Sequence, residues 1–362
     1  MNIKKIGLFA GLAVANGVAF ATCDSTLISY QSAVSTNNFV FAGQLISETP
    51  ECFGGSPTVA QVQINGTSFQ QMSAISRAMN LRFASDNPGP RAALDIKGMA
   101  AGNAGKKWNV WGSVENNDTR QSYRNLIATT TRNDSDVLNT VVGIDYSLSP
   151  SMVLGVSLAI DRGNMSGSDS TLSYFNQLDS DGYSVAPYFG MQLSKTLSLD
   201  ASLGMGRGKF DTIHRTEGKS DRWFGAANLN YEHWMGNVQF TGKASYLRGV
   251  EDYENLRSRG APVIGTAAKN TLGQLRLIGQ LGYWANGFMP YASLGWVSDI
   301  ERKTTQFGAG ANPIGKDAWV WSLGVNFISL SNGVTGGIAY RQEEGRSNQQ
   351  NKSLMANLGI RF

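Results

Sequence analysis

The last ten residues of the chain, 353–362, read SLMANLGIRF and alternate between two faces. The apolar face carries Leu354, Ala356, Leu358, Ile360 and Phe362. The opposite face carries Ser353, Asn357, Gly359 and Arg361, with Met355 as the one apolar exception. A period of two predicts a half-buried strand. Because chain ends usually fray in water, a strand that stops on a bare aromatic residue indicates an apolar environment at its last position.

The same alternation recurs from residue 107 onward. Three clear examples are SMVLGVSLAID (151–161), TLSLDASLGMG (196–206) and AWVWSLGVNF (318–327). Large apolar residues occupy one face of each, and the other face is small or polar. A soluble β-sandwich also alternates, but its outer faces usually carry many charges. Charged residues make up 16% of this chain, against about 25% in a typical soluble domain. The pattern therefore favours a wall with lipid outside and a polar lumen inside.

Counting these segments predicts twelve strands in the second part of the chain. They are placed at 107–116, 137–148, 151–162, 179–194, 196–209, 221–234, 237–250, 269–284, 287–300, 316–328, 333–343 and 350–362. Tight connections such as SLSPS, WMGN and ANG alternate with long polar stretches. Those stretches are 117–136, 163–178, 210–220, 251–268, 301–315 and 344–349. We therefore predict an all-β fold, a twelve-stranded antiparallel transmembrane β-barrel of the outer-membrane type, with short turns on the periplasmic side.

The N-terminus has the three parts of a secretory signal peptide. Two lysines precede the apolar run IGLFAGLAVANGVAF, and AFA (19–21) supplies a cleavage motif. We expect residues 1–21 to be removed by cleavage between Ala21 and Thr22. A membrane anchor is the alternative, but the run is too short to span a bilayer. A lipoprotein signal at Cys23 would require a residue smaller than Thr22 before it.

Two cysteines, Cys23 and Cys52, lie in the segment that follows. In an oxidising compartment they predict one disulfide, which would close a loop of about thirty residues and contribute about 3 kcal/mol. A metal site is not expected, because His214 and His233 are distant and give no ligand spacing. The net charge of +4 contains no basic block, so nucleic acid is not an expected partner.

An amphipathic helix is predicted over 67–84, between that segment and the barrel. Thr67 and Gln70 form a capping box at its start, and DNPGP (86–90) stops it. One apolar stripe runs along a polar body that includes Arg77 and Arg82. The stripe consists of Phe69, Met72, Ile75, Met79 and Phe83. A helix of about 25 Å matches the height of a barrel's apolar band, which suggests a lumenal plug. The alternative is a helix that lies in the periplasm or on the membrane surface.

Catalytic chemistry has little support. A hydrolase would need a base beside its nucleophile, whereas His233 falls beside a predicted turn and His214 in a long loop. GMGRGK (204–209) lies along a strand rather than before a helix, and NDSD (133–136) lacks the rest of a calcium loop. We therefore expect no enzyme and no cofactor. The alternation predicts that several charged residues line the lumen, where they form either a supporting network or a selectivity lining. These are Glu115, Asp145, Asp161, Asp200, Glu232, Lys243, Arg276 and Arg341.

Taken together, a signal peptide, a helix and a barrel that opens with KWNVWGSVE (107–115) and ends with LGIRF (358–362) resemble the translocator domain of autotransporters, the type V secretion proteins. VVGIDYSLSPSMVLGVSLAID (141–161) looks like that family's second and third strands. The resemblance covers about 67–362 and implies that the N-terminal part passes through or beside the barrel, with the helix as linker and plug. Some members cut their linker at a paired Asn; Asn80 here has no such partner.

The end of the chain carries a second resemblance, to the C-terminal recognition signal of outer-membrane barrels. It attaches to Leu354, Leu358, Ile360 and Phe362. It implies outer-membrane lipid, a barrel-assembly machinery and periplasmic chaperones as partners. The expected localisation is the outer membrane of a Gram-negative bacterium, with the N-terminal segment at the cell surface.

The organisation that follows is a signal peptide (1–21), a short exported segment (22–66), a linker with a lumenal helix (67–106) and a barrel (107–362). Family passengers usually have hundreds of residues, so this exported segment departs from the family's pattern. Our hypothesis is an outer-membrane barrel that exports or displays its own N-terminal segment, whose surface ligand the sequence does not identify. The alternatives are a pore gated by a periplasmic segment and an outer-membrane hydrolase.

Overall fold

The computed structural model describes residues 29–30, 32–33, 107–124, 130–169, 174–213, 216–255, 257–258, 260–262, 267–303, 314–329 and 333–362. The predicted signal peptide, the disulfide pair Cys23 and Cys52, and the predicted helix at 67–84 lie outside these ranges. In the described part of the chain, no helix has the length and apolarity needed to cross a membrane.

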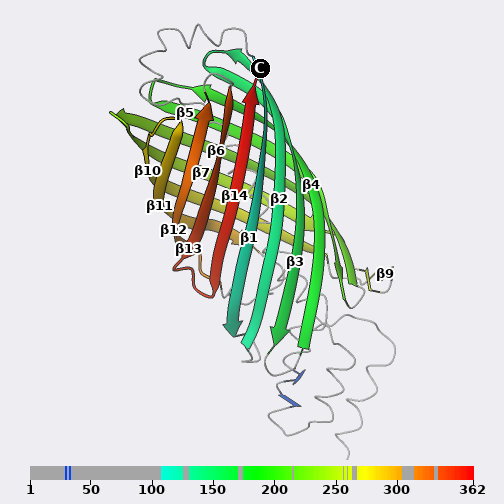
Figure 1. Cartoon of the computed structure of the whole chain (residues 1–362). Coiled ribbons are helices and arrows are strands. Elements are labelled where there is room, and N and C mark those ends of the chain that lie inside the picture. The colour runs from blue at the N-terminus through cyan, green and yellow to red at the C-terminus, as the bar shows by residue number, and fades with distance from the viewer. Residues whose placement is uncertain are drawn as a thin grey trace, which may run out of the picture.

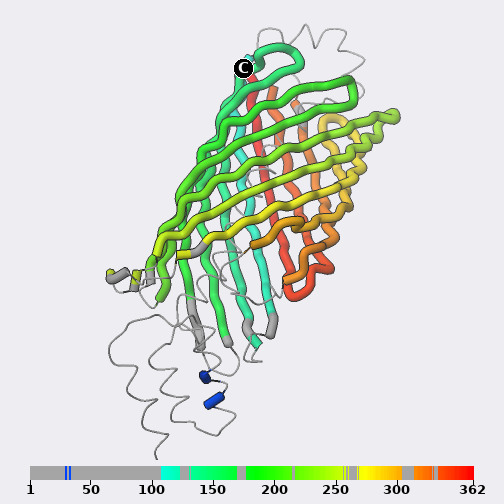
Figure 2. Tube along the Cα trace, turned by 180° about the vertical axis from the view of Figure 1, so that it is seen from behind, coloured from blue at the N-terminus to red at the C-terminus, as the bar shows by residue number. Residues whose placement is uncertain are grey.

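Fourteen strands form one sheet, and twelve of them are long. The long strands are β1 (Trp108–Arg124), β2 (Thr130–Ser149), β3 (Met152–Asp169), β4 (Tyr174–Gln192), β5 (Leu197–Thr212), β6 (Thr216–Met235), β7 (Val238–Tyr253), β10 (Ala268–Tyr283), β11 (Phe288–Lys303), β12 (Asp317–Ser329), β13 (Val334–Glu344) and β14 (Gln349–Arg361). Two short strands, β8 (Arg257–Ser258) and β9 (Ala261–Pro262), lie between β7 and β10. Each long strand pairs antiparallel with the next, and β1 pairs with β14, so the sheet closes into a barrel (Figures 1 and 2). The predicted twelve-stranded antiparallel barrel is confirmed.

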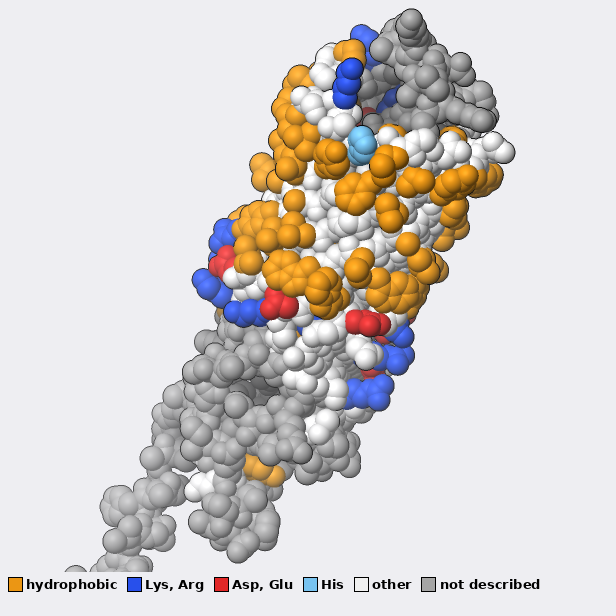
Figure 3. Space-filling view, turned by 90° about the vertical axis from the view of Figure 1, so that its left-hand side faces the viewer, with side chains coloured by type: hydrophobic (Ala, Val, Ile, Leu, Met, Phe, Trp, Pro, Cys, Tyr) orange, Lys and Arg blue, Asp and Glu red, His pale blue; other side chains and the backbone are white. Residues whose placement is uncertain are grey.

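The outer surface carries an apolar band. On β3 the outward side chains run from Met152 through Leu154 and Leu158 to Ile160, and the next outward residue is Arg162. At about 3.3 Å per residue and a strand tilt near 40°, this run covers roughly 20–25 Å along the barrel axis, which is the height of a lipid-facing band. On the face drawn in Figure 3, which is another side of the barrel, hydrophobic side chains gather in a zone above a group of charged side chains.

The strands continue beyond the apolar band, which corrects the predicted boundaries. Residues expected in long loops, 117–136, 163–178 and 210–220, belong largely to β1–β6. Backbone pairing continues there, while the outward side chains become polar and form cross-strand ion pairs such as Arg120–Asp134, at 3.9 Å. The prediction stopped each strand where its regular apolar alternation ended. Beyond that point the outward residues are polar, and isolated inward apolar residues such as Met165, Leu178 and Phe210 do not form a recognisable pattern.

Tight turns close the end of the barrel that lies opposite these strand extensions. β1 begins and β14 finishes at this same end, where Trp108 and Phe362 are hydrogen-bonded. β10 and β11 are joined through Asn286 and Gly287, which have φ values of 50° and 94°. Two consecutive residues with positive φ match the hairpin turn that favours Asn-Gly, because its twist follows the twist of the strands. The ANG segment is thus the tight turn that the sequence predicts.

Candidate functional site: the lumen and the closing seam

The barrel closes where its last strand pairs with its first. The register runs from Asn109↔Arg361 to Gln121↔Gln349. At the rim, Trp108 and Phe362 exchange backbone hydrogen bonds, with N···O distances of 3.1 and 2.9 Å. The side chains of the predicted assembly signal all lie on the outer face, where they are exposed: Leu354, Leu358, Ile360 and Phe362. The apolar terminal face therefore borders lipid, and its recognition by an assembly machinery stays a prediction.

Side chains also join the two strands on the inner face of this seam. Thr119 Oγ1 donates to Asn351 Oδ1 at 3.3 Å, and Gln121 Nε2 donates to Gln349 Oε1 at 3.1 Å. Polar contacts inside and apolar side chains outside make the closing pair fit both environments at once. Nothing in a single strand's alternation identifies these partners, since the two residues of each pair are more than 200 positions apart.

Nearer the end of the barrel with the tight turns, a buried hydrogen-bonded chain links β1, β2 and β4. Trp111 Nε1 donates to Tyr188 Oη at 2.7 Å, and the Tyr188 hydroxyl donates to Asp145 Oδ2 at 2.8 Å. Asn109 Nδ2 donates to the same carboxylate oxygen at 3.2 Å. Each step satisfies a polar group that would be costly to bury alone. This chain stiffens the wall beside the seam.

Glycines provide the space for these aromatic rings. A Cβ on Gly143 would overlap the Trp111 indole, and a Cβ on Gly155 would lie 2.5 Å from Tyr188 Oη and 2.7 Å from Asp145 Cβ. The Gly-x-Asp-Tyr segment (143–146) and the apolar-Gly strand that follows it therefore have a packing role. Their glycines face inward beneath aromatic side chains that come from other strands.

A second buried cluster lies further from the tight turns, around Arg222 on β6. Its Nη1 is 2.8 Å from Asp161 Oδ1, and its Nη2 is 3.4 Å from Glu251 Oε1. Ser220 Oγ also donates to Glu251 Oε1, at 2.5 Å. A Cβ on Gly182 would lie 2.6 Å from Arg222 Nη2. The guanidinium thus lies flat against a glycine of β4, with carboxylates from β3 and β7 around it.

A third polar group occupies the part of the lumen nearest the tight turns. Asp200 Oδ1 accepts a hydrogen bond from Asn228 Nδ2 at 2.5 Å, and Asp200 Oδ2 accepts one from Asn230 Nδ2 at 3.0 Å. Asn230, Glu232 and Lys243 also line a cavity there. Opposite charges therefore line the same cavity at this end.

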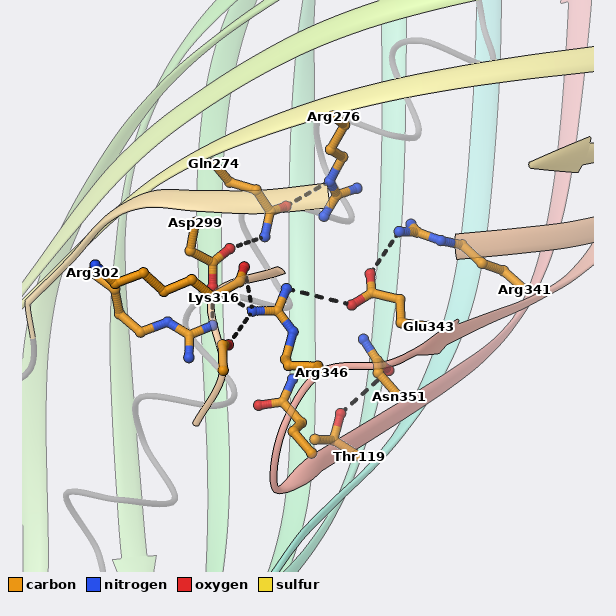
Figure 4. Close-up of polar contacts among 12 residues, drawn as sticks. Thr119, Gln274, Arg276, Asp299, Arg302, Lys316, Arg341, Glu343, Arg346 and Asn351 are labelled. Carbon is orange, nitrogen blue, oxygen red and sulfur yellow. Dashed lines mark hydrogen bonds and ion pairs between the residues drawn. The ribbon is translucent and has the colours of Figure 1, made fainter. Parts of the chain in front are cut away.

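The opposite wall, formed by β10–β14, carries an arginine-rich network (Figure 4). Asp299 accepts hydrogen bonds from Gln274 and Arg302, and its Oδ2 lies 2.7 Å from Arg346 Nη1. Arg276 Nε donates to Gln274 Oε1 at 2.5 Å. Arg341 is paired with Glu343 at 2.6 Å. The network joins β10, β11 and β13 to the turn before β14.

Among the described residues, the inward charges are divided between two walls. Acidic residues outnumber basic ones on the inner side of β1–β7: Glu115, Asp145, Asp161, Asp200, Glu232 and Glu251, with Arg222 and Lys243. Arginines outnumber acidic residues on β10–β14 and the turn at 345–348: Arg276, Arg302, Arg341 and Arg346, with Asp299 and Glu343. Opposite walls of opposite sign produce a field across the lumen.

The sequence predicts the inward direction of its lumenal residues correctly. Six of the eight are buried on the inner wall, namely Glu115, Asp145, Asp161, Asp200, Arg276 and Arg341. The other two, Glu232 and Lys243, line the cavity. Sequence reasoning missed Arg222, Glu251, Asp299 and Arg346. Arg222 and Asp299 lie within the predicted strands 221–234 and 287–300, and alternation also identifies Glu251 as inward once the predicted strand 237–250 is extended by one residue.

Catalytic and metal-binding groupings were also compared with the structure. No cluster of His, Cys, Asp and Glu in the described ranges could hold a metal ion. His233 is exposed on the outer face of β6, and His214 lies outside the described residues. Both GMGRGK and NDSD lie within strands, β5 and β2.

The comparison with protein families decides what kind of barrel this is. A family model described as "Autotransporter beta-domain" matches residues 110–341, more than half of the chain. The chain belongs to the autotransporter family. Passenger export is the role of this family's outer-membrane barrels, which are not enzymes in themselves. The membership indicates insertion in the Gram-negative outer membrane and, in general, a barrel-assembly machinery as partner.

Solved autotransporter barrels share the fold. The translocator domain of NalP from Neisseria meningitidis matches with a TM-score of 0.54 and 14% identity, over 80% of this chain and 99% of that one. The transport unit of AIDA-I from Escherichia coli has a TM-score of 0.53 and 12% identity, over 75% and 97%. The beta domain of BrkA from Bordetella has a TM-score of 0.53 and 17% identity, over 71% and 100%. No curated protein sequence matches the chain significantly.

Proposed function

We propose that this autotransporter barrel exports its own residues 22–66 to the cell surface and retains residues 67–84 in the lumen as a plug. The observation that carries the proposal is the closed twelve-stranded wall with a polar, charge-divided inner face. Eight-stranded barrels are filled by their own side chains, and porins of sixteen or more strands hold a channel. Twelve strands fall between these limits, which suits one helix of about 10–12 Å.

Charge complementarity supports the same occupant. Residues 67–106 contain five basic and two acidic residues: Arg77, Arg82, Arg91, Lys97 and Lys106, with Asp86 and Asp95. A basic segment is attracted to the acidic inner wall of β1–β7, because opposite charges interact more strongly where water is scarce. The linker would therefore lie closer to Asp161 and Asp200 than to the arginines of β10–β14.

Surface labelling of intact cells tests export directly. An epitope tag is inserted near Asn37 in the full chain, and a periplasmic protein serves as the leakage control. Labelling of intact cells is the expected result. Labelling only after permeabilisation would contradict export and would favour the alternative, a pore gated by a periplasmic segment.

Single-channel recording tests the plug separately. Deletion of residues 67–84 should raise the conductance of the refolded barrel, because a helix of that width blocks most of the lumen. A deletion of equal length within residues 22–66 provides the control. Unchanged conductance after the 67–84 deletion would show that this segment does not fill the lumen.

We propose no catalytic role for this chain. The third possibility, an outer-membrane hydrolase, makes its own prediction, which is lipid hydrolysis by the refolded protein that is lost on His233→Ala or His214→Ala. We expect no hydrolysis above that of a mock refolding reaction. Residues 22–66 also contain the cysteines, and we propose that Cys23 and Cys52 form a disulfide after export to the periplasm.

A further inference from the structure

Two guanidinium groups on the β10–β14 wall share one carboxylate oxygen. Asp299 Oδ2 contacts both Arg302 Nη2 and Arg346 Nη1 (Figure 4). The side chains of Arg302 and Arg346 are 8% and 2% exposed, and Asp299 is fully buried. Two cations held against one anion leave an excess of positive charge in a place with little water. Such an excess is unfavourable unless a further anion compensates it.

The two arginines also have donors left over. Arg302 Nε and Arg346 Nε are buried and have no hydrogen-bond acceptor among the residues that the structure describes. Arg346 Nη1 donates to Asp299 Oδ2 and to the backbone carbonyl oxygens of Gly315 and Lys316. These contacts hold its guanidinium rigidly in place. Buried unpaired donors on a fixed cation are an arrangement that a ligand with several oxygens can complete.

The surrounding charges reinforce the site. Arg276 and Arg341 extend toward the same group from β10 and β13 (Figure 4). Glu343 is the second acidic neighbour, 3.9 Å from Arg346 Nη2. Burial lowers the pKa of Arg346, which lies in the turn beyond the membrane-spanning strands, while Glu343 and Asp317 oppose that shift. An arginine stays protonated even when it is buried. The unfavourable free energy of burying its positive charge is therefore lowered when an anion binds beside it.

We propose that Arg302 and Arg346, supported by Arg276 and Arg341, form an anion site on the lumenal wall that binds an oxyanion of the phosphate, sulfate or carboxylate type. Planar guanidinium groups match such oxygens in a fork geometry that a single ammonium cannot provide. The oxyanion has two possible sources. One is a small anion from solution, and the other is a carboxylate of this chain between residues 22 and 106. The site does not depend on export of residues 22–66.

Inorganic phosphate is the probe for the test. The full chain is refolded in phosphatidylcholine vesicles, and its unfolding midpoint is measured as phosphate replaces chloride at constant ionic strength. We expect a rise in Tm of a few degrees that saturates. In Arg302→Gln the half-saturating phosphate concentration should increase at least tenfold, and in Arg302→Lys by a smaller factor. Arg207→Gln, on the outer face, is the matched control and should respond like the wild type.

A second arm separates the two sources. The five carboxylates between residues 22 and 106 are converted to amides: Asp24, Glu48, Glu51, Asp86 and Asp95. A saturating rise in Tm with phosphate in the wild type would show that the site is open to a free anion. A rise that occurs only in the amide variant would show that a carboxylate of the chain occupies the site in the wild type. A linear rise that is equal in Arg302→Gln would reflect a general salt effect and would overturn the site. The absence of any response in both backgrounds would overturn it as well.

Discussion

Replacing Arg222 by methionine is expected to destabilise the barrel by about 3–5 kcal/mol, the usual cost of removing one partner from a buried ion pair. Arg222 lies between Asp161 and Glu251, and the three side chains are 5%, 4% and 1% exposed. Methionine has a similar length and no charge, so packing against Gly182 is largely kept while both carboxylates lose this cation. The unfolding equilibrium constant should rise roughly one hundred to several thousand fold.

Arg207→Met provides the matched control on the neighbouring strand. Arg207 pairs with Asp221 at 3.1 Å, a distance close to that of the buried pair, but both side chains are 72% exposed. An exposed pair typically contributes about 0–1 kcal/mol, because water and salt screen it. The two variants therefore remove the same residue type from adjacent strands, and they differ in which side of the wall the side chain faces.

Urea unfolding of the refolded full chain in lipid vesicles, monitored by tryptophan fluorescence, gives both free energies. Combining Arg222→Met with Asp161→Asn and Glu251→Gln should recover much of the loss, since no buried charge then lacks its cation. Equal destabilisation by Arg222→Met and Arg207→Met would refute the reasoning. It would mean that water reaches Arg222 as freely as it reaches the outer surface.

Two further predictions concern packing and assembly. Gly155→Ala should lower the free energy of unfolding by about 1–3 kcal/mol in the same assay, because its Cβ would lie 2.5 Å from Tyr188 Oη. Gly112→Ala, whose Cβ would meet nothing closer than 3.7 Å, is the control and should change it by less than about 1 kcal/mol. Equal effects of the two variants would contradict the packing of Tyr188 against Gly155. Phe362→Ser should reduce the amount of folded barrel in the outer membrane, measured by heat-modifiable gel mobility, more than Phe288→Ser does. The two phenylalanines are 57% and 59% exposed at the same end of the barrel. If both variants reduced the amount of folded barrel equally, Phe362 would act only as one of the aromatic residues at the rim and not as part of a terminal recognition signal.

The sequence predicts the direction of side chains well, for a physical reason. Successive side chains of a strand face lipid and lumen in turn, so apolar and polar residues alternate. This alternation predicts which side chains point outward, such as Leu154, and which point inward, such as Asp161. Turn chemistry is equally local: Asn286 and Gly287 adopt the positive φ values that their residue types favour. Twelve strands and their order follow from these two signals.

Partners across the barrel could not be predicted, because they depend on register summed over several strands. Trp111 and Tyr188 are 77 residues apart, and Arg222 and Asp161 are 61 apart. A shift of one residue in any intervening pair would reverse which face a side chain takes. The extensions of β1–β6 beyond the apolar band were missed for a local reason. Their outward residues are polar, and isolated inward apolar residues such as Met165 and Phe210 do not produce a regular alternation.

The divided charge of the lumen links the two proposals and makes them separable. If the basic linker is attracted to the β1–β7 wall, the arginines of β10–β14 remain available to an anion. Arg302→Gln should then raise the half-saturating phosphate concentration at least tenfold without reducing surface labelling of a tag near Asn37. Asp161→Asn should leave the phosphate response intact, because Asp161 lies on β3 and pairs with Arg222 of β6, whereas the network around Asp299 belongs to the opposite wall. Loss of surface labelling in a folded Arg302→Gln barrel would mean that both walls guide the exported segment, and the assignment of one role to each wall would be wrong.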